Sequence, residues 1–254
     1  MISIKNNNEI AKMRESNRIV GLLLHKLDDI IQPGISTYDI DRFADELIRN
    51  EAGKAAFKGY TVPGLPPFPA AVCSSVNSCI VHGIPSKNKI LQEGDIIGID
   101  VGVYKNGYYG DAARTYQVGS ISKEADELMA VTREALKRGI SEARDGARVG
   151  DISYAIGLYV ISQGYFVADN LTGHGIGTAL HEDPMVPNFG LKGKGPRLKK
   201  GMTIAIEPMV NIGTNRVIEN GWEFYVADDS LSAHYEHTIL ITDNEAELLT
   251  EHRE

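Results

Sequence analysis

Two aspartates in a β-rich stretch are spaced so that their carboxylates could act together. The dipeptide Asn106-Gly107 separates two β-rich runs, and Asn-Gly in that setting is the strongest short signal for a two-residue hairpin. In such a hairpin Asp100 faces Ala113, and Asp111 is a diagonal neighbour of Asp100 on the same face, about 7–8 Å away. A carboxylate pair among apolar residues needs a cation or a shared proton. Two ordinary turn or edge aspartates remain the alternative.

Two glutamates stand in a similar setting. Glu207 ends the apolar run 202–206, and Glu236 begins the run 236–241. Lysine and arginine are scarce in these stretches, so a metal ion is the simplest source of positive charge. His174 lies between glycines, where it could add a nitrogen ligand, although a histidine in such a turn is often structural. Four carboxylates and one imidazole favour Mn, Co or Fe(II) over a thiolate-bound structural zinc, and they favour a two-metal site.

The chain contains an internal repeat, which predicts a duplicated architecture. Three pairs of segments match in the same order: 34–40 with 146–152, 82–84 with 174–176, and 91–100 with 198–207. In the third pair Asp100 aligns with Glu207, so both halves supply an acid at the same place. We therefore expect a single catalytic domain built from two pseudo-symmetric halves, residues 1–118 and 119–254.

Hydrophobic periodicity predicts helices followed by strands in each half. The expected helices are residues 9–31, 37–50, 122–143 and 151–163, and the β-rich stretches are 80–116 and 202–242. Segregated helices and mainly antiparallel strands indicate an α+β fold, with the helices packed on one side of a curved sheet. A TIM barrel fits the length but needs eight alternating units. Residues 60–69 carry four prolines and should form a surface loop near the site.

Composition excludes several classes of function. The chain has 254 residues, with 26 basic and 34 acidic side chains, and this negative balance argues against a general nucleic-acid binder. Cys73 and Cys79 are too few for a disulfide framework, and we expect reduced thiols. Neither a membrane-length apolar run nor a secretion signal is visible, so a cytoplasmic protein is expected.

The ordered set of five candidate ligands resembles the metal site of the methionine aminopeptidases. Their relatives, the Xaa-Pro peptidases and creatinase, share the duplicated pita-bread fold. The resemblance covers essentially the whole chain. It is supported by five strings in family order, residues 81–85, 173–177, 181–184, 206–209 and 235–238.

The resemblance implies a role for each matching residue. The metal ligands would be Asp100, Asp111, His174, Glu207 and Glu236, which would hold two divalent ions (Co, Mn, Fe(II) or Zn) with Asp111 bridging them. Glu207 would also help to deprotonate the attacking water. His82 and His181 would contact the scissile amide and the following residue of the substrate. The pocket for the methionine side chain would be lined by Tyr60, Phe68, Cys73 and Trp222.

Two pocket positions depart from the family pattern. Phe57 stands where bacterial relatives often have cysteine, and Leu180 where an aromatic is common. The proline-rich loop 60–69 also looks longer than usual. For each pocket residue ordinary core packing is the alternative. We expect His25, His234, His237 and His252 to be structural or exposed.

The function implied by the resemblance is removal of the initiator methionine from nascent proteins. Transient association with the ribosome, a monomeric state, no nucleic-acid specificity and no membrane association would go with it. The short spacing of 26 positions between His181 and Glu207 resembles the bacterial type I form. An Xaa-Pro-type peptidase is the main alternative, although those relatives typically carry an additional N-terminal domain. A non-catalytic peptide-binding homologue is a third alternative, but such proteins lose metal ligands.

Overall fold

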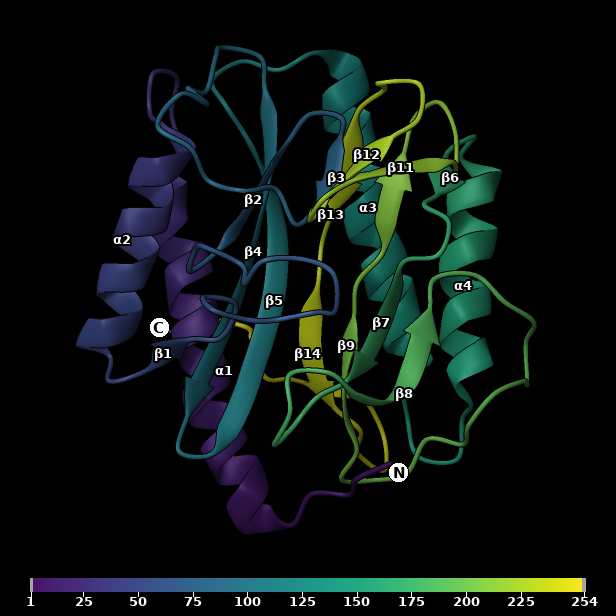
Figure 1. The fold of residues 1–254 in the computed structure, drawn as a ribbon. Coiled ribbons are helices and arrows are strands. Elements are labelled where there is room, and N and C mark those ends of the chain that lie inside the picture. Colours follow the sequence, from purple (N-terminus) through teal and green to yellow (C-terminus); the bar gives the residue numbers. More distant parts are fainter. Residues whose placement is uncertain (1, 253–254) are drawn as a thin grey trace.

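A computed structural model describes residues 2–252, and Figure 1 shows strands in the middle of the molecule with helices beside them. The α-helices of this range are α1 (Asn7–Lys26), α2 (Thr37–Asn50), α3 (Lys123–Ser141) and α4 (Val149–Ser162), and a 3₁₀ helix, η1 (Leu27–Asp29), follows α1. The strands are β1 (Lys54–Ala55), β2 (Cys73–Val76), β3 (Cys79–Val81), β4 (Ile96–Lys105), β5 (Tyr108–Gln117), β6 (Phe166–Val167), β7 (Thr172–Gly175), β8 (Glu182–Pro187), β9 (Thr203–Ile206), β10 (Met209–Asn211), β11 (Val217–Asn220), β12 (Glu223–Val226), β13 (Ser232–His234), β14 (His237–Leu240) and β15 (Glu247–Leu248).

Two sheets form the centre of the fold. The first pairs β1, β4 and β2 in that order, with β5 added on β4, and the second has the order β15-β14-β9-β7-β8. Two three-stranded sheets, β13-β10-β6 and β11-β12-β3, complete the arrangement. Every strand pairing within residues 2–252 is antiparallel. The expected α+β class with a mainly antiparallel sheet is confirmed.

The helices begin and end close to the predicted residues. The first helix starts two residues earlier than expected because Asn6 caps it: the Asn6 side chain accepts from the backbone N–H groups of Asn8 and Glu9, and the Glu9 side chain accepts from the N–H of Asn6. This reciprocal arrangement is a capping box. The same helix ends at Lys26, and the chain continues as η1 rather than as a regular α-helix to residue 31. No helix within residues 2–252 has the length and apolarity needed to span a membrane.

Each pair of helices covers its own group of strands. Helix α1 packs against β4 and β5, whereas α3 contacts β9, β10 and β13 and α4 contacts β6 and β8 (Figure 1). The apolar core follows the same division. One buried cluster joins residues between 19 and 118, and another joins residues between 125 and 241 together with Ile96. The sheets are thereby fixed from the helical side, and their other side is free to carry the site.

The repeated segments adopt matching local conformations at their glycines. Gly94 and Gly201 both have a positive φ, 93° and 88°, a conformation that glycine adopts without strain. Gly83 and Gly175 each pass so close to a neighbouring backbone carbonyl that an added Cβ would lie 2.2 Å from its oxygen. Both glycines follow a histidine of the site, His82 and His174. The common origin of the two halves stays a prediction.

Candidate active site

The hairpin of β4 and β5 positions the two aspartates as predicted. Asn106 and Gly107 are the loop residues, both with positive φ, and Asp100 faces Ala113. Asp111 faces Gly102 and is therefore the diagonal neighbour of Asp100. Both carboxylates open into one cavity of about 950 Å³. The predicted register is confirmed, and it explains how a local turn brings two acids together.

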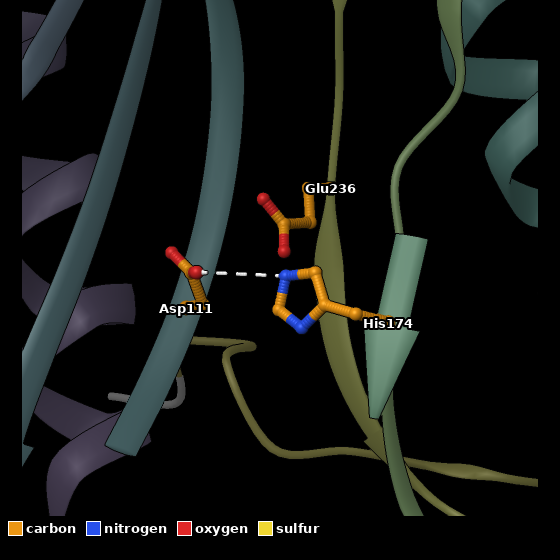
Figure 2. Close-up of side chains that lie close together, drawn as sticks. All are labelled: Asp111, His174 and Glu236. Atoms are coloured by element: carbon orange, nitrogen blue, oxygen red, sulfur yellow. Dashed lines mark ion pairs between the residues drawn. The ribbon is translucent and has the colours of Figure 1, made fainter. Parts of the chain in front are cut away.

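The second half contributes the other three predicted ligands to the same cavity. His174 lies on β7, Glu207 directly follows β9, and Glu236 lies between β13 and β14. The His174 Nε2 atom is 3.6 Å from Glu207 Oε1 and 4.0 Å from Asp111 Oδ2. Figure 2 shows Asp111, His174 and Glu236 pointing toward one another, and one potential ligand atom from each lies within 4.8 Å of the others. The structure thus brings together all five side chains, although they come from distant parts of the chain.

The protein around this cluster supplies too little positive charge to keep four carboxylates ionised together. Burial raises the pKa of Asp100 to about 7 and that of Glu207 to about 8. Burial and the neighbouring carboxylates also raise the pKa values of Asp111 and Glu236 well above their ordinary range. Among the described residues that line the cavity, no lysine or arginine is present.

Several buried polar atoms of the cluster have no hydrogen-bond partner within residues 2–252. They are Oδ1 of Asp100, Oδ1 of Asp111 and Oε1 of Glu236. A buried carboxylate oxygen without a partner is costly. Hard oxygen donors with one imidazole are the ligands that divalent Mn, Fe or Co accept. The residues present therefore fit a divalent metal ion.

His174 is held in the form that a metal ligand requires. Burial lowers its pKa to about 3, so the ring is neutral at physiological pH. Its Nδ1 atom lies 2.9 Å from the carbonyl oxygen of Gly175. Because a carbonyl only accepts, Nδ1 carries the proton and the lone pair of Nε2 faces the carboxylates.

His234 belongs to the cluster, which the sequence reasoning missed. We expected it to be structural or exposed, but it is only 3% exposed and its Nε2 atom lies 3.6 Å from Glu207 Oε2. One potential ligand atom each of His234, Glu207 and Glu236 lies within 4.8 Å of the others. The signal was the spacing of two between His234 and Glu236, which places both side chains on one face of an extended chain.

The two predicted substrate histidines both line the cavity. His181 lies edge-to-face with His174, with ring centroids 4.4 Å apart, and its Nδ1 atom is 2.8 Å from the Tyr60 hydroxyl oxygen. His82 has a φ of 58°. Its ring and that of Phe224 are arranged edge-to-face, with ring centroids 5.4 Å apart. Burial lowers the pKa of His82 to about 4 and also lowers that of His181. Both rings are therefore neutral at pH 7 and can donate one hydrogen bond each.

The four predicted pocket residues also line this cavity: Tyr60, Phe68, Cys73 and Trp222. Phe68 and Trp222 meet edge-to-face with centroids 5.4 Å apart, and the Trp222 indole N–H donates to the carbonyl of Pro66 at 2.9 Å. Residues 60–69 form a loop, as predicted, and this hydrogen bond fixes it over the cavity. Phe57 and Leu180 line the cavity as well. Burial raises the pKa of Cys73, so the thiol is neutral and behaves as an apolar wall.

Comparison with known proteins gives matches along nearly the whole chain. The model of metallopeptidase family M24 matches residues 11–243. A methionine aminopeptidase of Clostridium acetobutylicum is 48% identical over 252 residues, which cover 98% of this chain and 99% of that protein. Methionine aminopeptidase 1 of Bacillus subtilis is 44% identical, with the same coverage of both chains.

Solved structures also match nearly the whole chain, and their sequence identities distinguish close relatives from proteins that share only the fold. The crystal structure of a methionine aminopeptidase from Thermotoga maritima superposes with a TM-score of 0.95 at 45% identity, covering 99% of this chain and 100% of that one. A prolidase from Pyrococcus horikoshii superposes with a TM-score of 0.79 at 23% identity, covering 98% of this chain and 64% of that one. The second likeness concerns the fold alone, which is the expected pita-bread architecture.

Proposed function

This chain belongs to metallopeptidase family M24, and from that premise we propose that it removes the N-terminal methionine from polypeptides by metal-dependent hydrolysis of the first peptide bond. One observation carries the proposal: a single cavity joins four carboxylates and a neutral histidine to an aromatic pocket. The named relatives, which match over almost their entire length, are methionine aminopeptidases.

Divalent metal would be held by Asp100, Asp111, His174, Glu207 and Glu236. We propose two ions, because four carboxylates exceed the charge that one divalent ion neutralises; Co, Mn, Fe(II) and Zn all suit these donors. When bound, such ions supply Lewis acidity that polarises the scissile carbonyl and makes water a better nucleophile. The Nε2 atom of His234 lies 3.6 Å from Glu207 Oε2, beyond hydrogen-bond distance, so His234 neighbours this carboxylate without fixing its position.

The remaining residues bind and orient the substrate. Glu207 would accept the proton of the attacking water. A hydrogen bond from the Tyr60 hydroxyl to Nδ1 of His181 would leave the proton of this histidine on Nε2, from which it can be donated to the scissile amide. His82 would contribute a second neutral donor. The ring edges of Phe68 and Trp222 suit the polarisable sulfur of a methionine side chain.

The cellular setting is proposed from the same kinship. We expect a monomer that acts in the cytoplasm on nascent chains, with transient association at the ribosome exit, without nucleic-acid specificity and without membrane association. The net charge of −8 and the bacterial relatives support this expectation.

A cleavage assay followed by mass spectrometry tests the proposal. Metal-stripped protein is given Mn, Co, Fe(II), Zn or no metal, and then Met-Ala-Ser, its N-acetylated form, Leu-Ala-Ser or Ala-Pro-Ala. Metal-dependent loss of methionine from the free amine alone is the expected result. Cleavage of Ala-Pro-Ala instead would assign the chain to the Xaa-Pro-type peptidases, whose fold it shares. No cleavage by folded protein with any metal would favour a non-catalytic peptide-binding protein.

A further inference from the structure

A second cavity lies directly beside the catalytic cavity. It has a volume of about 650 Å³ and lies between the start of α4 and the segment 184–196. Asp183 and Met185 of β8 line both cavities, so the two spaces adjoin along this strand. The walls of the second cavity are mainly apolar and include Val149, Pro187 and Leu191.

The rim of this second cavity exposes large apolar side chains. Leu191 is 71% exposed, Met185 68% and Phe189 50%. Met185 alternates with buried neighbours along β8, so its outward direction follows from the strand itself. Clustered exposed apolar side chains beside a cavity are typical of a binding surface rather than of ordinary solvent-exposed surface.

Strand β8 runs from the catalytic cavity along the second cavity. It begins at Glu182, next to His181, and ends at Pro187. Six residues of extended strand span roughly 20 Å. A polypeptide whose first peptide bond lies at His181, and which continues alongside β8, would reach the second cavity with about its fifth to seventh residues.

We propose that the second cavity binds apolar side chains of the downstream part of the polypeptide whose N-terminus is in the catalytic cavity. The inference rests on the proposed function, because it needs a polypeptide substrate. The occupant follows from the continuity of the two cavities: a chain that is longer than a few residues has to leave the catalytic cavity, and the adjoining space is apolar. The protein therefore selects its substrates by downstream residues in addition to the first two.

Two heptapeptides of equal length test this proposal. Met-Ala-Ser-Gly-Leu-Phe-Gly carries apolar side chains at positions five and six, and Met-Ala-Ser-Gly-Ser-Asn-Gly carries polar ones. The wild-type protein should cleave the apolar heptapeptide with a kcat/KM about tenfold higher, since partial burial of two apolar side chains suffices for that factor. The tripeptide Met-Ala-Ser serves as the reference substrate that does not reach the second cavity.

Two variants locate the effect. Leu191→Ser should reduce the preference for the apolar heptapeptide to about twofold or less and leave the kcat/KM for Met-Ala-Ser unchanged. Ile161→Ser on α4 is the matched control, since Ile161 is equally exposed at 66% and does not line the cavity. This control should keep the full tenfold preference. Because all these side chains are exposed, both variants should fold.

The outcomes separate this inference from the function on which it rests. Equal cleavage of the two heptapeptides by wild-type protein, or an undiminished preference in Leu191→Ser, would overturn the downstream site while the aminopeptidase function stands. Failure to cleave even Met-Ala-Ser would remove the function and this inference together. Sedimentation that shows a wild-type dimer, and a monomer for Leu191→Ser, would overturn the inference in favour of a second copy covering the cavity.

Discussion

A buried ion pair holds the chain segment that carries His181. Lys5 Nζ lies 2.7 Å from Glu182 Oε2, with the two side chains only 3% and 12% exposed. The other oxygen of Glu182 accepts hydrogen bonds from the backbone N–H groups of Thr178 and Ala179. The pair therefore ties the N-terminal segment to the turn directly before His181.

Replacing Lys5 by methionine keeps the apolar stem and removes the charge. Breaking a buried pair by removing one partner costs about 3–5 kcal/mol. We take the lower end, about 3 kcal/mol, because Glu182 keeps its backbone donors. For a chain of this size the expected fall in Tm is then roughly 6–12 °C. The control Lys123→Met breaks an exposed pair with Glu127 and should change Tm by less than about 2 °C.

The pH dependence of this difference identifies its cause. Burial by itself would raise the pKa of Glu182, but the hydrogen bond and charge of Lys5, with the N–H groups of Ala179 and Thr178, lower it below 4.5. A group whose folded pKa is lowered contributes stability above its unfolded pKa and loses it as the pH falls through the folded value. The gap between wild type and Lys5→Met should therefore be full at pH 7 and shrink below about pH 4.5.

Calorimetry and urea unfolding, both with excess chelator so that metal binding does not contribute, measure this gap. A loss in Lys5→Met no larger than that in Lys123→Met would refute the reasoning. So would a gap that stays constant between pH 7 and pH 4, because the contribution would then not come from the charge of Glu182.

Four further predictions concern the site. Asp111→Asn should reduce turnover by at least about 10³-fold without loss of the folded circular dichroism spectrum, because it removes one ligand charge; normal activity would exclude the metal role. Tyr60→Phe should lower kcat about tenfold with little change in KM, since it removes the hydrogen bond that orients His181, and an unchanged kcat would contradict this. Gly175→Ala should lower Tm by more than about 6 °C, because its Cβ would lie 2.2 Å from a backbone oxygen. Metal-free protein should lose stability as the pH rises from about 4 to about 7, because burial raises the folded-state pKa of Asp100 to about 7 whereas the unfolded chain loses this proton near pH 4; Mn²⁺ should restore the Tm at pH 8.5, and a pH-independent Tm without metal would count against the buried cluster.

Local signals in the sequence were sufficient to predict the hairpin and its two aspartates. A two-residue Asn-Gly loop fixes the register of the two strands that it joins. Counting residues from the loop therefore predicted that Asp100 pairs with Ala113. The helices were predictable for the same reason, since caps and apolar periodicity act over a few residues. The loop at 60–69 followed from its prolines.

The roles of the distant residues depended on the family resemblance, because residue spacing alone does not place β7, β9 and β14 next to one another. His234 shows the limit most clearly. It matched no family string that we used, and its side chain reaches Glu207 only through the pairing of β13 with β10. The sequence did not predict the adjoining second cavity either, because α4 and the segment 184–196, which form it, are separate in the chain.

The sequence by itself determined the α+β class, the hairpin that pairs Asp100 with Asp111, and the excess of carboxylates that calls for a cation. These are consequences of local backbone preference and of charge, which act over short stretches of chain. Only the tertiary structure decided which acids meet, which histidine stands beside Glu207, and which apolar side chains remain exposed beside the cavity. These features depend on contacts between residues far apart in sequence. The packing of the two halves against each other makes those contacts, and no local backbone preference encodes that packing.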